Sequence, residues 1–177
     1  METQNLVASV CVKWWRSNLV GDDGPARMKR ARLRRCTVPL EALLIDSVHD
    51  LGHGLQMAGY NKFNADGLAL VAIGISYIQQ SDENAKKLAE EFGRKESKDG
   101  PRVFSEQRFQ NLIRTTDKGE LIAPLRRGLA IVRKRPINVA SLAKDLFYWD
   151  DKTRISWCFQ YFGASALYEP EFKEIKN

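Results

Sequence analysis

The chain has 177 residues, of which 44% are hydrophobic, so it holds enough apolar material for a folded core and is not a disordered chain. Its 28 lysines and arginines outnumber 22 acidic residues and give a net charge of +6, which favours a polyanion as partner over a cation. Three widely spaced cysteines suit neither a disulfide framework nor a CxxC zinc site, and no signal peptide or long apolar run is visible. We therefore expect a cytoplasmic protein with no membrane contact.

The positive charge is concentrated in two segments of the chain. Residues 1–36 carry eight basic and three acidic residues, and residues 102–135 carry nine basic and three acidic residues. The rest of the chain is net negative. This distribution favours two basic patches over an even coat of charge.

The first of these segments predicts a basic helix over residues 25–36, with a proline at its first position and Asp23 near its N-terminal cap. Within it, six cations follow one another without an acidic residue, and their mutual repulsion favours a bound nucleic acid over a passive solvated face. Arg27, Arg30 and Arg34 are spaced i, i+3, i+7, so we expect them to project along one line towards successive phosphates. The six cations are Arg27, Lys29, Arg30, Arg32, Arg34 and Arg35.

The segment from His49 to His53 (HDLGH) has the spacing of the HExxH zinc motif. Asp50 stands where that motif has glutamate, Gly52 and Gly54 indicate that the helix ends there, and the sequence has no third histidine. We therefore expect no metal, no cofactor and no catalysis. A metal-dependent phosphohydrolase that uses His49, Asp50 and His53 remains the alternative from another class.

Helical periodicity continues along the chain. The apolar run 68–78 predicts a buried helix, although a buried strand would have a similar composition. The stripe 85–92 predicts a helix capped by Ser81. Residues 94–102 are polar, contain glycine and proline, and predict a flexible loop. The four tryptophans have apolar neighbours at helical spacing, so we expect them in the core.

In the C-terminal part, apolar stripes over residues 109–113, 139–146 and 155–162 predict helices. Ser105 and Asn138 are expected to cap two of these helices, and Gly163 is expected to end the last one. Pro124 is placed at the first position of a helix in preference to the interior of one. The chain is thus predicted to be all-α, with eight or nine short helices in two packed helical subdomains. The predicted parts are an N-terminal helical half (1–93), the flexible loop (94–102) and a C-terminal helical half (103–177).

The second basic segment interleaves cations with an apolar stripe, so the cations are expected on the outer faces of their helices. Together they match the electrostatic footprint of phosphate-backbone binding, which needs no base-reading motif. These cations are Arg108, Arg114, Lys118, Arg126, Arg127, Arg133, Lys134 and Arg135.

Four motifs occur in an order that resembles one known family. They are Trp14-Trp15 followed by Leu33-Arg34-Arg35-Cys36, then Arg108–Arg114 (RFQNLIR), then Leu125-Arg126-Arg127, and last Leu142–Trp149 (LAKDLFYW). In this order and spacing, over about residues 10–163, the chain resembles the small subunits (CasB type) of the type I-E CRISPR surveillance complex, Cascade.

The resemblance implies a non-catalytic, all-helical subunit of an RNA-guided antiviral complex, two copies of which lie head to tail. Its expected partners are the other Cascade subunits, a second copy of itself, the heteroduplex of guide RNA and target DNA, and the displaced DNA strand. A free-standing helical DNA-binding protein, with residues 24–36 as its recognition helix, is the second alternative. The motifs suggest backbone contacts at Arg34, Arg35, Arg114, Arg126 and Arg127, and charge and spacing add Arg27, Arg30 and Arg133.

Overall fold

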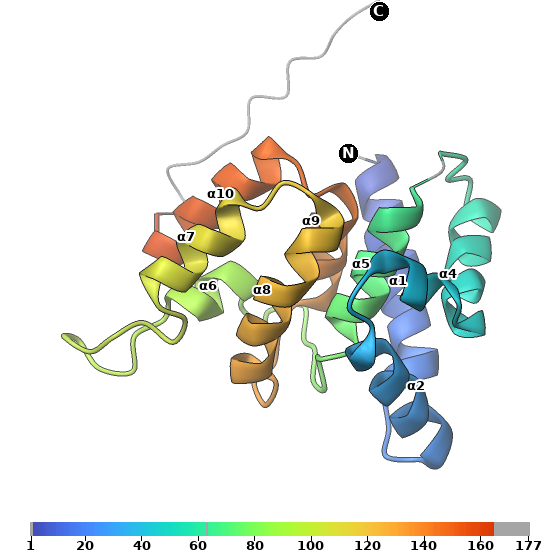
Figure 1. Ribbon diagram of the computed structural model, residues 1–177, viewed down its shortest axis with the longest axis horizontal. Coiled ribbons are helices and arrows are strands. Elements are labelled where there is room, and N and C mark those ends of the chain that lie inside the picture. Colours follow the sequence, from blue (N-terminus) through green and yellow to red (C-terminus); the bar gives the residue numbers. More distant parts are fainter. Residues whose placement is uncertain (1, 63, 165–177) are drawn as a thin grey trace, which may run out of the picture.

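The chain forms ten α-helices in a computed structural model that describes residues 2–62 and 64–164 (Figure 1). The fold is therefore all-α as predicted, with ten helices where we expected eight or nine. None of the helices in these ranges is both long and apolar enough to cross a membrane. The helices are α1 (Glu2–Leu19), α2 (Gly24–Arg35), α3 (Pro39–Leu43), α4 (Asp46–Met57), α5 (Ala65–Ile75), α6 (Leu88–Gly93), α7 (Glu106–Arg114), α8 (Lys118–Val132), α9 (Val139–Tyr148) and α10 (Asp151–Phe162).

The helices form two packed groups that meet in the middle of the molecule. Figure 1 shows α1, α2 and α4 on the right, α6, α7 and α10 on the left, and α5, α8 and α9 between them. Helix α9 packs against α1 and α5, and α8 packs against α5, so helices from both halves of the sequence share one core. The packing thus crosses the predicted boundary at 94–102, and the division of the chain into two helical halves stays a prediction.

Three of the predicted helix ends are confirmed by their hydrogen bonds. The carboxylate of Asp23 accepts the N–H of Ala26 at 2.7 Å, and the side chain of Asn138 accepts the N–H of Ser141 at 2.8 Å. Gly163 ends α10 with a φ of 75°, a left-handed conformation that favours glycine. Capping residues therefore placed these boundaries correctly from the sequence.

The prediction for Pro124 was wrong. Helix α8 begins at Lys118, after Asp117, whose carboxylate accepts the N–H of Glu120 at 2.9 Å, and Pro124 lies inside the helix. A proline in that place removes one backbone hydrogen bond of the helix. Both turns around it are nevertheless held, because Leu121, Ile122 and Leu125 are fully buried in the core. Tertiary packing overrides the local preference.

The predicted cap at Ser81 was also wrong. Helix α6 begins only at Leu88, with Lys87 at its N-cap position. The hydroxyl of Ser81 instead accepts the N–H of Val139, at 3.1 Å, in the first turn of α9. Ser81 therefore satisfies a free donor at the start of a helix 58 residues further along the chain.

Helix α4 does not end at its glycines, as the sequence had suggested, but continues to Met57. A Cβ atom at Gly54 would lie 3.2 Å from Cγ1 of Val10, and one at Gly52 would lie 3.4 Å from Cδ2 of Leu68. The glycines therefore allow α1 and α5 to approach α4 closely. They serve helix packing here and do not stop the helix.

The four tryptophans belong to the core, as predicted, and none exposes more than 6% of its surface. Because the rings are buried, they have no free face for stacking on bases, and every indole N–H donates to an acceptor inside the protein. The acceptors are the carbonyl oxygens of Ser47, Ile78 and Thr115 and the carboxylate of Asp145.

The 94–102 loop is anchored at its C-terminal base. The guanidinium of Arg102 donates from Nη1 to the carbonyl oxygens of Gly93 (2.6 Å) and Tyr161 (3.0 Å). Residues 95–99 are exposed. The mobility that we expect for this loop remains a prediction, and the anchored base confines it to the tip.

Candidate nucleic-acid interface

The guanidinium of Arg30 is used by the fold itself. Only 9% of the residue is exposed, and its Nη1 donates to the carbonyl oxygens of Leu19 (2.5 Å) and Gly21 (2.7 Å). Its Nη2 lies 3.8 Å from the carboxylate of Asp22. These contacts hold the turn between α1 and α2. The structure thus gives Arg30 a structural role, and the backbone contact expected from charge and spacing stays a prediction.

The other arginines of α2 divide between surface and interior. Arg27 and Arg35 are exposed, and their side chains bond to no described residue. Arg34 is half-buried and donates from Nε (2.9 Å) and Nη2 (2.5 Å) to the carbonyl oxygen of Ser76. Arg27, Arg30 and Arg34 therefore do not form the predicted row of solvent-exposed side chains, because the side chain of Arg30 is buried.

The basic face of α8 shows the same division. Arg126 is half-buried, donates from Nε to the hydroxyl of Tyr77 at 3.1 Å, and donates from Nη1 to the carbonyl oxygen of Cys36 at 3.4 Å. Arg127 and Arg133 are exposed, and no described residue forms a hydrogen bond or ion pair with either side chain. Helix α8 and its C-cap therefore carry two free guanidinium groups, those of Arg127 and Arg133, and one, that of Arg126, that is hydrogen-bonded within the protein.

The two basic segments meet around Tyr77. Burial lowers the pKa of Arg34, and the positive charges of Arg30 and Arg133 lower it further, so charges nearly 100 residues apart in sequence act on one another. An anion at this place would relieve that repulsion. We call Arg34, Arg126 and Arg133, which these interactions bring together, and their exposed sequence neighbours Arg35 and Arg127 the α2–α8 basic surface.

Other cations of the second segment are distributed differently. Arg114 ends α7, is exposed and has no partner among the described residues. Lys118 donates to the carbonyl oxygen of Phe147 at 2.9 Å, and Arg135 lies 3.1 Å from the buried carboxylate of Glu91. Lys118 and Arg135 thus contribute contacts within the fold, and Arg114 remains a candidate for backbone contact.

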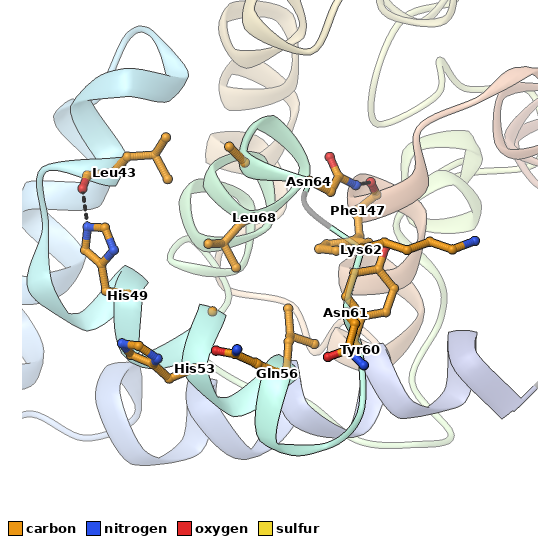
Figure 2. A pocket seen from close by; sticks show the side chains of 13 residues that line it. Leu43, His49, His53, Gln56, Tyr60, Asn61, Lys62, Asn64, Leu68 and Phe147 are labelled. Carbon is orange, nitrogen blue, oxygen red and sulfur yellow. Dashed lines mark hydrogen bonds between the residues drawn. The ribbon is translucent and has the colours of Figure 1, made fainter.

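His49 and His53 lie one turn apart on α4, beside a cavity of about 580 Å³ (Figure 2). The Nε2 atom of His49 is 2.7 Å from the carbonyl oxygen of Leu43, so that ring nitrogen already has a partner. In residues 2–62 and 64–164, no three His, Cys, Asp or Glu side chains come together as a metal site would require. The phosphohydrolase alternative therefore gains no support.

Sequence reasoning missed Tyr77. It lies at the end of the predicted apolar run 68–78, where it was counted only as apolar. The residue is 8% exposed, and a buried tyrosine hydroxyl generally finds a hydrogen-bond partner. On that ground, the sequence could have predicted a buried hydrogen bond at Tyr77, but it could not have identified the bonding partners.

These features define a small all-helical protein in which Arg34 of α2 comes close to Arg126 of α8 and to Arg133, an arginine of the second basic segment. Residues 29–162 match the model of a protein family described as CRISPR-associated protein Cse2. The chain therefore belongs to the CRISPR-associated Cse2 family, which confirms the family suggested by the four motifs.

A solved structure supports the same fold. A chain in the crystal structure of E. coli Cascade bound to a PAM-containing double-stranded DNA target superposes with a TM-score of 0.63 at 18% sequence identity. The match covers 92% of this chain and 97% of that chain. At this identity the likeness is one of fold. A comparison with curated protein sequences gave no match.

Proposed function

We propose that the protein is the non-catalytic small subunit of a type I-E Cascade complex and that it serves antiviral defence by holding nucleic-acid backbones without sequence preference. The observation that carries this proposal is the α2–α8 basic surface. There, Arg35, Arg127 and Arg133 are exposed and have no partner among the described residues. Free guanidinium groups suit phosphates, since their forked donors match phosphate oxygens. Arg27 and Arg114 would extend the contact.

The subunit would act on the opening of target DNA. Opening replaces a DNA duplex by a heteroduplex of similar stability, so modest backbone contacts are enough to tip the balance. A protein that binds the displaced strand or the heteroduplex, and not the closed duplex, stabilises the open state by linkage. No base-specific contact is needed for this effect.

The proposed partners are the other Cascade subunits, a second copy of the chain, the heteroduplex of guide RNA and target DNA, and the displaced strand. The matched crystal structure, that of E. coli Cascade bound to a PAM-containing double-stranded DNA target, supports this setting. The three free cysteines suit a reducing cytoplasm, where we place the complex. In this role the subunit performs no chemistry and needs no cofactor.

A titration of unrelated single-stranded and duplex oligonucleotides at several salt concentrations tests the proposal. We expect weak binding that does not depend on sequence and that falls steeply as salt rises, because phosphate contacts release counterions. A flat salt response would contradict backbone binding. A strong preference for one duplex sequence would instead support the free-standing DNA-binding alternative, although Arg30, on the helix that would enter the groove, is already bonded to carbonyl oxygens inside the protein.

A further inference from the structure

The side chain of Tyr77 contacts both half-buried arginines of the α2–α8 basic surface. Its hydroxyl donates to the carbonyl oxygen of Arg34 at 3.3 Å and accepts from Nε of Arg126 at 3.1 Å. The guanidinium carbon of Arg34 lies over the tyrosine ring, 5.2 Å from the ring centroid. One buried side chain thus joins α2 to α8.

Each of these arginines is held on one side and has donors left over. Arg34 uses Nε and Nη2 on the carbonyl oxygen of Ser76, and Arg126 uses Nε on Tyr77 and Nη1 on the carbonyl oxygen of Cys36. No described residue takes Nη1 of Arg34 or Nη2 of Arg126. Both side chains remain partly exposed, so these nitrogen atoms are available to a ligand.

We propose that Tyr77 is a positioning residue that holds Arg34 and Arg126 as a pre-arranged pair for backbone phosphates. This inference rests on the proposed function. An arginine that is already fixed in its binding geometry loses less conformational freedom when a phosphate arrives. Nucleic acid would then bind to an ordered pair of guanidinium groups, whereas the exposed Arg127 must be ordered on binding.

Tyr77→Phe isolates this role, because it keeps the ring under Arg34 and removes only the hydroxyl. We expect the variant to bind a single-stranded oligonucleotide about three- to ten-fold more weakly, the range that one hydrogen bond covers. In a chain that already carries Arg126→Ala, the same change should have little further effect. A tyrosine that served packing alone would weaken binding equally in both backgrounds, and that result would overturn the inference.

A second comparison does not depend on how well Tyr77→Phe folds. Arg126→Lys keeps the charge but lacks the Nε donor that bonds to Tyr77, whereas Arg16→Lys is a matched change at an exposed arginine that lies outside the α2–α8 basic surface and has no described partner. We expect Arg126→Lys to weaken binding about as much as Tyr77→Phe does, and Arg16→Lys to leave it nearly unchanged. Equal effects of the two lysine variants would contradict the inference.

The same titrations separate this inference from the proposed function. If the unmodified protein binds with a steep salt dependence but Tyr77→Phe binds equally well, only the positioning role fails. If the unmodified protein shows no salt-dependent binding, the proposed function fails and the positioning role fails with it.

Discussion

Removing the free arginines of the α2–α8 basic surface should abolish most backbone binding while the fold survives. The variant is Arg35→Ala, Arg127→Ala and Arg133→Ala together. These side chains are exposed and bond to no described residue. Each change should therefore alter the free energy of unfolding by no more than about 0.5 kcal/mol. For a chain of this length, a total loss of about 1 kcal/mol lowers Tm by roughly 2–4 °C.

The effect on binding should be much larger than the effect on stability. Each phosphate contact to a single strand changes the slope of log K against log salt by about 0.7, so losing three contacts lowers the slope by about 2. At about 0.15 M salt, counterion release is then worth about 0.8 kcal/mol per contact, or roughly fifty-fold in affinity for three. Fluorescence anisotropy at several salt concentrations measures the slope and the affinity together.

A matched variant controls for the loss of net charge. Lys62→Ala, Lys98→Ala and Lys152→Ala remove the same three charges from exposed positions outside the α2–α8 basic surface. We expect this control to bind almost normally. In the assembled complex, the arginine variant should lose stable opening of target DNA while guide RNA loading is less affected. Equal losses in the two variants, or unfolding of the arginine variant, would refute the assignment of this surface.

Three further outcomes follow from the structure. His49→Ala with His53→Ala should leave nucleic-acid binding and thermal melting nearly unchanged, and stoichiometric metal that is present in the unmodified protein and lost from the variant would contradict this. Limited proteolysis should cut first at residues 95–99, because this tip of the loop is exposed while the base at Arg102 is anchored. A first cut in any other internal segment would contradict this prediction. Burial raises the pKa of Asp145 from 3.8 to about 6, so the folded protein holds a proton that the unfolded chain releases. The contribution of Asp145 to stability is therefore fully present below about pH 4, and roughly 3 kcal/mol of it is lost as the pH rises through 6. Asp145→Asn keeps an acceptor for Trp157 and should remove this fall, which urea unfolding at several pH values would reveal as a flatter profile.

The positions of helices could be predicted from the sequence where apolar spacing and capping residues act within a few residues of the chain. Apolar spacing identified α5, α7, α9 and α10, and the caps at Asp23, Asn138 and Gly163 act within a few residues of the chain. The errors arose where distant contacts decide the outcome. Pro124 stays inside α8 because the turns on either side of it are buried, and Ser81 bonds to a backbone group 58 residues away.

From the sequence, the candidate site could be predicted only as two segments rich in positive charge. All eight candidate arginines look alike in a sequence, and what separates them is whether the fold supplies an acceptor. Arg34 finds one 42 residues away at Ser76, and Arg126 finds one 49 residues away at Tyr77. Such partners depend on how helices pack, which periodicity and spacing do not report. The basic segments could be named in advance, but the groups left free within them could not.

Some arginines of the basic segments are bonded inside the protein and others are exposed, and this difference explains how a surface with so much positive charge is stable before any nucleic acid binds. Arg30, Arg34 and Arg126 each donate to oxygen atoms inside the protein, and these contacts offset part of the repulsion between the two basic segments. The exposed groups, such as Arg35 and Arg127, keep their donors for phosphate. Each free contact is weak at physiological salt. The surface should therefore bind feebly in the isolated protein and become effective only inside an assembly, where the opened strand is held at a high local concentration.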